Sequence, residues 1–182
     1  PDWATWSLRE YGARVGAFRI LDELDRHGFR PSVALGAAAA ARYPELVDAC
    51  RQRDAAFLGR GVLADHRISS AMSEAEEREL IATSCDAIRA ATGRTPTGWA
   101  GQDFNESQCT PRLLGEAGFG YTTDWANDDR PYLLGPVGNR RLVALPAQIM
   151  WNDLEAMWLR RVTPDDWSAA ILAAAEALHA EG

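Results

Sequence analysis

Arg60 is the first residue in the chain whose type and setting suggest chemistry. It follows the apolar run AAFLG and lies between Gly59 and Gly61, so its neighbours shield the guanidinium very little. A guanidinium at the end of a strand can hold a carboxylate or a ureide carbonyl with two parallel hydrogen bonds. We interpret Arg60 as a catalytic group; the alternative is a structural ion pair with a nearby acid.

The segment Asp124–Asp129 (DWANDD) is the densest group of polar side chains, with three carboxylates, an amide and an indole after a short apolar run. Carboxylates paired in partly apolar surroundings can have their pKa values driven apart, which gives one acid and one base. We therefore interpret Asp128 as a candidate to activate water, and Asp124, Trp125 and Asn127 as candidates to bind substrate. The alternative is a turn with helix-capping acids.

Gln102 and Asp103 follow Trp99 in the segment GWAGQDFNES. A carboxylate here is a second candidate to activate water, and Gln102 is a candidate to bind substrate. Gly101, Asp103 and Asn105 are also ordinary loop residues, so a solvated turn is the alternative.

Trp99, Trp125 and Trp151 all fall at expected strand ends. Their rings would form an apolar wall that stacks on a small planar or sugar-like ligand. Asn152 and Asp153 follow Trp151 and are a further candidate pair for binding substrate. Their alternative role is to cap the next helix.

The histidines and cysteines do not suggest a metal or nucleophilic site. They are widely spaced, at His27, His66, His179, Cys50, Cys85 and Cys109. Three scattered histidines do not support a catalytic triad, and three cysteines without a C-x-x-C pattern are not a disulfide framework. We expect no cofactor, and a divalent metal such as zinc is disfavoured.

Composition excludes several partners. The chain has 182 residues, with 19 Lys and Arg against 26 Asp and Glu, a net charge of −7. No run of basic residues is present, and nucleic acid and anionic membranes both require a concentrated basic face. The longest apolar stretch, 35–41, is far shorter than a membrane-spanning helix. We expect one domain, 1–182, in the cytoplasm.

Hydrophobic periodicity predicts short strands alternating with helices. An amphipathic helix ends at "RHG" with Gly28, and the capping box at Ser73 and Glu76 starts a long helix that Gly93 closes. Strands are expected at 32–35, 55–59, 97–100, 121–124 and 142–145. Further helices are expected in the Ala-rich segment after Leu35, from Pro44, from about Pro111 to Ala117, and from Pro164 to the end of the sequence. This order predicts an α/β fold with a mostly parallel sheet and helical crossovers.

The order of these features resembles the polysaccharide deacetylase superfamily (NodB homology domain, carbohydrate esterase family 4). The resemblance rests on a G-W turn followed by TPRLLGEAGFGYTTDWANDDRPYLL and then RLVALPAQIMWNDL, together with REYGARVGAFRILDELDRHGFRPSVAL and MSEAEERELIATSCDAIRAATGRTPTGW. Within the superfamily, these motifs are most similar to the branch with cofactor-independent allantoinases and cyclic imide hydrolases. The implied fold is a distorted TIM-like β/α barrel, with chemistry at the carboxyl ends of the strands.

This sequence departs from the family at the metal site. The resemblance implies a divalent metal bound by an early Asp and a His-x-x-x-His motif, and a late His as general acid. The segment RGVLA, with Arg60 and Ala64 at its ends, occupies the motif. The implied Asp and late His would lie on strands before Pro1 and after Gly182. Either these ends are absent from this chain, or a partner closes an open barrel.

The resemblance and the candidate residues together imply a hydrolase of non-peptide C–N bonds in an amide, imide or ureide, working without the usual metal site. Two alternatives stay open: a catalytically degenerate binding module, and a divergent biosynthetic enzyme on the same scaffold. We expect a small-molecule substrate. We also expect a homo-oligomer whose contacts involve Trp3, Trp6 and the Ala-rich last helix.

Overall fold

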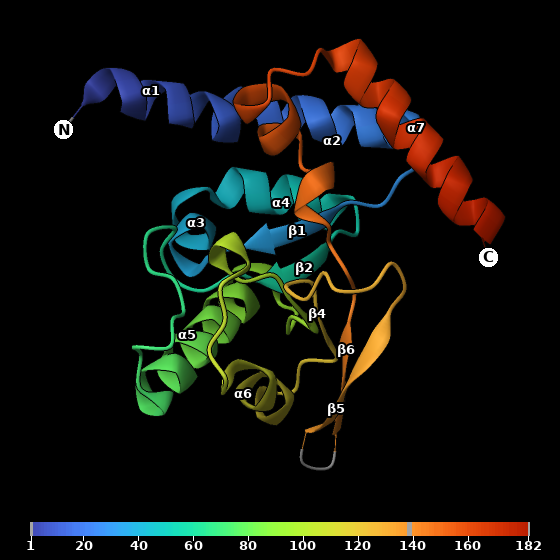
Figure 1. Cartoon of the computed structure of the whole chain (residues 1–182). Helices are drawn as coiled ribbons and strands as arrows, with labels where there is room; N and C mark the ends of the chain where they lie inside the picture. Colours follow the sequence, from blue (N-terminus) through green and yellow to red (C-terminus); the bar gives the residue numbers. More distant parts are fainter. Residues whose placement is uncertain (1, 138–139, 182) are drawn as a thin grey trace.

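The computed structural model describes residues 2–137 and 140–181 of the chain. Its centre is one six-stranded sheet, in the order β1-β2-β3-β4-β6-β5 (Figure 1). The strands are β1 (Ser32–Leu35), β2 (Ala56–Gly59), β3 (Gly98–Trp99), β4 (Tyr121–Thr122), β5 (Tyr132–Val137) and β6 (Arg140–Ala144). All five strands predicted from the sequence are therefore present, and the fold is the predicted mixed α/β type.

The sheet is parallel except at one edge. Strands β1, β2, β3, β4 and β6 run in the same direction, and only β5 pairs with its neighbour β6 in the antiparallel sense. Parallel neighbours need a long crossover, and helices supply the crossovers from β1 to β4. The carboxyl ends of β2, β3 and β4 consequently meet at one edge of the sheet.

The helices lie where the sequence predicts them, with one addition at the start. They are α1 (Trp3–Tyr11), α2 (Ala17–Arg26), α3 (Ala37–Arg42), α4 (Pro44–Gln52), α5 (Glu74–Thr92), α6 (Thr110–Ala117) and α7 (Pro164–Glu181). The capping box of α5 is confirmed: Ser73 N donates to Glu76 Oε2 at 2.8 Å, and Glu76 N donates back to Ser73 Oγ at 3.3 Å. Gly93, with φ of 72°, ends the helix in the left-handed region.

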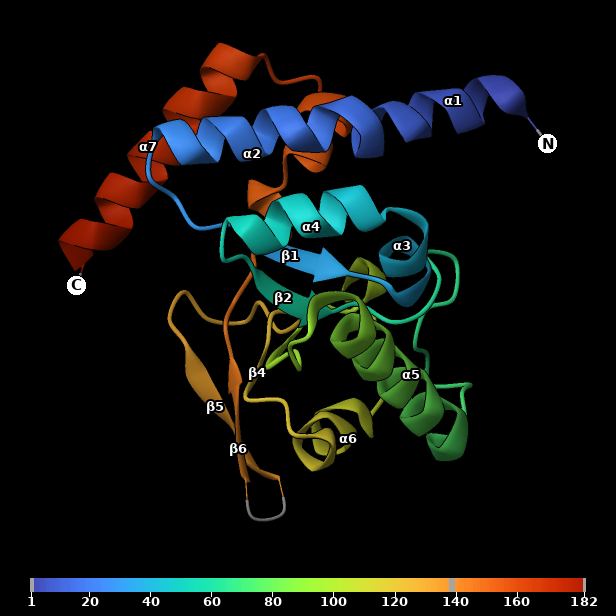
Figure 2. The same cartoon turned by 180° about the vertical axis from the view of Figure 1, so that it is seen from behind.

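The amino-terminal segment was not predicted to be helical. Asp2 caps α1 by accepting from the backbone N–H groups of Ala4 and Thr5. A π-helical turn, η1 (Gly12–Gly16), then joins α1 to α2, and Figure 2 shows the two helices as one long rod along one side of the molecule. Helix α1 has no buried residue, so a pattern of buried apolar positions could not reveal it.

Two apolar clusters form the core. One contains Trp99, Phe119 and Ile81, and the other contains Leu21, Phe57 and Ile88. Trp99 is completely buried, and its ring meets that of Phe119 edge-on with centroids 5.5 Å apart. Within the described residues, no helix is long and apolar enough to cross a membrane.

Candidate active site

Three predicted site residues meet where neighbouring strands end. Arg60 directly follows β2, Gln102 begins the 3-10 turn η2 (Gln102–Phe104) after β3, and Asp124 follows β4. Because β2, β3 and β4 are adjacent and parallel, their loops emerge at the same edge. In barrels of the TIM type, this edge carries the active site.

Arg60 is hydrogen-bonded to an amide rather than to an acid. Its Nε donates to Gln102 Oε1 at 3.1 Å, and Gln102 Nε2 donates in turn to Asp103 Oδ1 at 2.8 Å. Across residues 2–137 and 140–181, no carboxylate oxygen lies within 4 Å of the Arg60 guanidinium, and its two terminal nitrogens have no hydrogen-bond partner. The structural ion pair considered from the sequence is thus not formed with any described acid.

A hollow of about 430 Å³ opens beside Arg60. Arg42 and Tyr43 form its polar wall with Arg60 and Gln102, and Leu63 adds an apolar surface. The volume falls within the range of small-ligand pockets. A planar molecule with carbonyl groups could reach the free edge of the Arg60 guanidinium there.

Asp124 accepts hydrogen bonds from the backbone of the loop that follows β3. Both its carboxylate oxygens are 2.9 Å from the Gly101 backbone N–H. Burial raises the pKa of Asp124 above its ordinary value, although the Gly101 hydrogen bond and the charge of Arg60 both oppose the rise. A Cβ on Gly101 would come within 2.6 Å of Asp124 Oδ2, so only glycine permits this close contact.

Glu106 is the site residue that the sequence analysis missed. Its side chain accepts from the Trp125 indole Nε1 at 2.6 Å and from Thr122 Oγ1 at 3.2 Å, and its carboxyl group lies within hydrogen-bonding reach of Asp124. Burial, with the neighbouring Asp124 carboxyl, raises the pKa of Glu106 to about 8. Two acids so close cannot both ionise easily.

The loop that carries Gln102 to Glu106 has strained backbone. Asp103 and Phe104 both adopt positive φ angles, 55° and 57°. Left-handed conformations cost non-glycine residues about 1–2 kcal/mol each. Strain of this kind persists only where surrounding contacts enforce it, and it is concentrated at functional sites.

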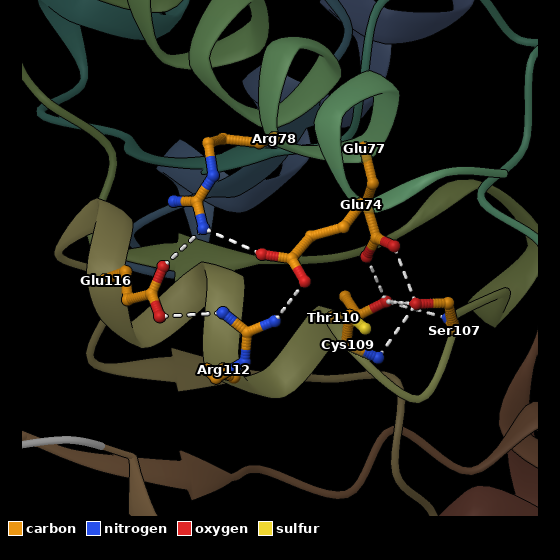
Figure 3. A network of polar contacts seen from close by, with 8 residues as sticks. All are labelled: Glu74, Glu77, Arg78, Ser107, Cys109, Thr110, Arg112 and Glu116. Carbon is orange, nitrogen blue, oxygen red and sulfur yellow. Dashed lines mark hydrogen bonds and ion pairs between the residues drawn. The ribbon is translucent and has the colours of Figure 1, made fainter.

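A buried acid on α5 anchors the chain directly after this loop. Glu77 accepts from Ser107 Oγ at 2.6 Å and from Thr110 Oγ1 at 2.5 Å, and Cys109 N donates to Ser107 Oγ at 2.9 Å (Figure 3). Beside it, four charged side chains tie α5 to α6 in a ring of ion pairs, formed by Glu74, Arg78, Arg112 and Glu116. This network fixes the chain immediately after Glu106.

The other residues of the DWANDD segment have local partners. Asn127 accepts from the Tyr132 hydroxyl, and the exposed Asp128 accepts from Arg130 N at 3.0 Å, as in a turn. Trp125 is 38% exposed and orients its indole toward Glu106. Asp103 is also exposed and forms an ion pair of 3.0 Å with Arg67.

The tryptophans do not form the single wall expected from the sequence. Trp99 is 0% exposed, so both faces of its ring are covered by protein and the ring cannot stack on a ligand. Trp151 lies in the 3-10 turn η3 (Ile149–Trp151) and stacks on Trp167, with centroids 5.7 Å apart. Asn152 and Asp153 both accept from Leu154 N, at 2.9 and 2.8 Å, which is the capping alternative.

The residues present do not fit the family's metal site. Arg60 and Ala64 provide neither of the two imidazole ligands that the resemblance implies. Among the residues that the structure describes, no three His, Cys, Asp or Glu side chains are grouped to hold a metal ion. His27, His66 and His179 are all exposed and lie in separate segments.

Comparison with solved structures agrees with this fold. The chain is similar to the Puue allantoinase (27% identity, TM-score 0.87, covering 99% of this chain and 59% of that one). It is also similar to a protein named as a polysaccharide deacetylase from Mycobacterium smegmatis (28% identity, TM-score 0.77, covering 82% of this chain and 51% of that one). A third similar structure is a protein named as a probable polysaccharide deacetylase from Pseudomonas aeruginosa PAO1 (28% identity, TM-score 0.73, covering 85% of this chain and 51% of that one). No family model matches the sequence, and neither does any curated protein.

These matches define a deacetylase-like α/β fold of the NodB type. They confirm the resemblance to the polysaccharide deacetylase superfamily, with an allantoinase among the similar structures. The chain spans between 51% and 59% of the length of these three proteins.

Proposed function

We propose that this chain carries the substrate site of a hydrolase that cleaves non-peptide C–N bonds in amides, imides or ureides. The observation that carries the proposal is the Arg60 side chain, which stands at the carboxyl end of β2 with two terminal nitrogens unpartnered among the described residues and a hollow beside it. Similarity to an allantoinase and to deacetylases supports this class of reaction.

Arg60 would hold and polarise the carbonyl oxygen of the substrate. A planar guanidinium offers two parallel donors, and it keeps its charge at every relevant pH. Gln102 orients it through the 3.1 Å hydrogen bond to Nε, which leaves the opposite edge of the guanidinium for the ligand.

Asp124 is a better candidate to activate water than either acid predicted from the sequence. Asp103 is engaged with Arg67, and Asp128 is exposed and accepts from the backbone of its own turn. Asp124 is instead partly buried, beside Arg60, and has a raised pKa, which makes its carboxylate a stronger base. Arg60 and Ala64 stand where the family's imidazole ligands would be, so we propose that the reaction proceeds without a metal at that position.

The test is an assay of the full chain on three substrate classes: a cyclic ureide, a cyclic imide and an N-acetylated sugar, each with and without a chelator. Arg60→Lys should already lose most of the activity, because an ammonium cannot reproduce the two-pronged contact. Arg60→Ala should lose about 30-fold to 1,000-fold in kcat/KM, equivalent to about 2–4 kcal/mol.

The matched control is Arg89→Ala, which removes an exposed arginine that pairs with Asp86 on α5. Neither alanine variant should change the melting temperature by more than a degree or two, since Arg60 leaves only an amide behind. A large drop in melting temperature for Arg60→Ala, with activity retained, would identify a structural arginine instead.

One observation favours a binding module as the second candidate: Arg60 and Ala64 stand where the family's metal ligands would be. Calorimetry separates the two functions. A binding module would take up one of the three compounds without turning it over, and Arg60→Ala would weaken that binding.

A further inference from the structure

We propose that Glu106 and Asp124 share one proton and work as a pair, in which Asp124 accepts a proton from water while Glu106 delivers one to the leaving nitrogen. The inference rests on the proposed function, and it adds a catalytic residue and a division of labour between two acids.

The geometry brings the two carboxyl groups together from different loops. Glu106 comes from the loop after β3 and Asp124 from the end of β4, and Thr122 connects them: its Oγ1 donates to Glu106 Oε1 at 3.2 Å and accepts from Asp124 N at 3.3 Å. The two carboxyl groups are close enough for each to shift the pKa of the other. A direct hydrogen bond between two carboxyl groups requires that one of them hold a proton. In the proposed pair, the two carboxyl groups together carry one proton and one negative charge at neutral pH.

The other contacts indicate which acid holds the proton. Asp124 is the better anion, since the Gly101 N–H donates to both its oxygens and Arg60 is the nearby cation. Glu106 has two neutral donors, Trp125 and Thr122, and burial and the neighbouring Asp124 carboxyl both raise its pKa. The raised pKa of Glu106, about 8, agrees with a carboxyl group that is still protonated at neutral pH.

An unsatisfied donor next to the pair points to a ligand. Trp99 Nε1 is buried and has no hydrogen-bond partner. The nitrogen edge of its ring faces Gly101: a Cβ built there would lie 3.2 Å from Trp99 Nε1 and 2.6 Å from Asp124 Oδ2. A buried N–H without a partner costs about 1–3 kcal/mol, which a bound acceptor would recover.

These groups suit a substrate that has both a carbonyl oxygen and a nitrogen. Arg60 and the Trp99 indole are donors, the Asp124 carboxylate is an acceptor, and protonated Glu106 is a donor of a transferable proton. In an amide, imide or ureide, the carbonyl oxygen can accept from the donors, and the leaving nitrogen can take the proton from Glu106. A plain carboxylate would be repelled by the charge of Asp124.

The proton balance closes without another reactant. Asp124 takes a proton from water as the water oxygen bonds to the carbonyl carbon, and the electron pair of the breaking C–N bond goes to nitrogen. Glu106 gives its proton to that nitrogen. The proton on Asp124 then passes to Glu106 through their hydrogen bond, which restores the starting state.

The first experiment measures the pair without relying on activity. Carboxyl groups of the full chain, labelled with ¹³C, are titrated by NMR, and Glu106→Gln and Asp124→Asn assign the two signals. One carboxyl group should have a pKa well above the range of ordinary glutamates. Asp124→Asn should lower that pKa, because it removes the neighbouring negative charge. Two signals in the ordinary range would overturn the proposal.

The second experiment follows hydrolysis of whichever substrate class is active. Glu106→Gln should lower kcat by about 100-fold to 10,000-fold, with KM little changed, and remove the alkaline limb of the pH profile. Glu79→Gln, an exposed acid on α5, is the matched control. Hydrolysis that persists in Glu106→Gln would overturn the role of Glu106 and leave the proposed function intact.

A third outcome separates the two proposals in the other direction. The wild-type chain could show a carboxyl group with a raised pKa and yet hydrolyse none of the three substrate classes. That result would support the shared proton but overturn the proposed function, and with it the catalytic roles of Glu106 and Asp124. Circular dichroism of each variant, which should match the wild type, checks that the loss is not one of folding.

Discussion

Ser107 donates a hydrogen bond of 2.6 Å to Glu77, and this contact joins the loop of Glu106 to the longest helix of the fold, α5. Glu77 is almost completely buried, and both its oxygens accept from hydroxyl groups, those of Ser107 and Thr110. Glu77 thus anchors the chain next to Glu106 from α5, through the contacts with Ser107 and Thr110 that are drawn in Figure 3.

Replacement of Glu77 should destabilise the protein. Glu77→Ala would leave two buried hydroxyl donors without acceptors, and each such group costs about 1–3 kcal/mol. We expect the free energy of unfolding in urea to fall by about 2–5 kcal/mol. Glu79→Ala, two residues along the same helix and exposed, should change it by less than about 0.5 kcal/mol. Equal effects of the two substitutions would contradict a structural role for Glu77.

Stability should decrease as pH rises through neutrality. The pKa of Glu106 is raised from its ordinary 4.5 to about 8 in the folded chain, so between these values the folded state holds more protons than the unfolded state. The contribution is fully present below pH 4.5 and is lost as pH rises to about 8, by at most about 1.4 kcal/mol per pH unit for one proton.

Urea unfolding at several pH values between 5 and 8.5 measures this slope. Glu106→Gln should flatten it, because the amide does not titrate. Asp124, whose pKa burial also raises, contributes with the same sign, so Asp124→Asn should flatten the curve too. A wild-type stability that is constant or increasing over this range would show that the pair is not protonated.

Gly101→Ala should disturb the site by sterics alone. Gly101 has φ of −58° and ψ of 154°, a conformation open to any residue, yet its Cβ would lie 2.6 Å from Asp124 Oδ2. Asp124 must then move and lose its hydrogen bonds to the Gly101 backbone. We expect a loss of about 1–3 kcal/mol in unfolding free energy and a lower melting temperature.

Gly12→Ala is the control for this substitution, because no atom lies within 4 Å of its Cβ position. It should leave the protein unchanged or stabilise it by up to about 1 kcal/mol. If the two substitutions had the same effect, close packing at Gly101 would not be the cause.

We predict that two copies of the chain associate through the amino-terminal helix. Trp3 and Trp6 are 67% and 44% exposed, and their rings meet edge-on with centroids 5.7 Å apart. Sedimentation at micromolar concentration should give a dimer or larger species, and Trp3→Ser with Trp6→Ser should give monomers. Phe29→Ser, at an exposed position outside α1, is the control. A wild-type monomer would refute the prediction.

The sequence predicts the parallel part of the fold well, because each element carries its own local signal. Ser73 and Gly93 delimit α5, and apolar runs of four or five residues mark β1 and β2. Strand β5 has no such signal: Gly135 and Pro136 interrupt it, and its register with β6 shifts between Leu133 and Pro136. Helix α1 is missed for a related reason, since none of its residues is buried.

Some residues of the candidate site can likewise be recognised from the sequence, and one cannot. Arg60, Gln102 and Asp124 are recognisable because each lies within three residues of the end of a strand. Glu106 lies 18 positions before Asp124, and no spacing rule shows that the two would meet. Its raised pKa depends on burial contributed by two loops, which only the folded chain defines.

The strand order also bears on the order in which the strands can pair while the chain is being synthesised. From β1 to β4, each strand pairs with the one before it in the chain, so during synthesis every new strand meets an edge that already exists. Strand β5 breaks this rule, because it pairs only with β6, which is made later. When residues 1–137 have left the ribosome, β2, β3 and β4, which support Glu106 and Asp124, have all been synthesised. Strand β5 has then been synthesised too, but β6, the strand it pairs with, has not.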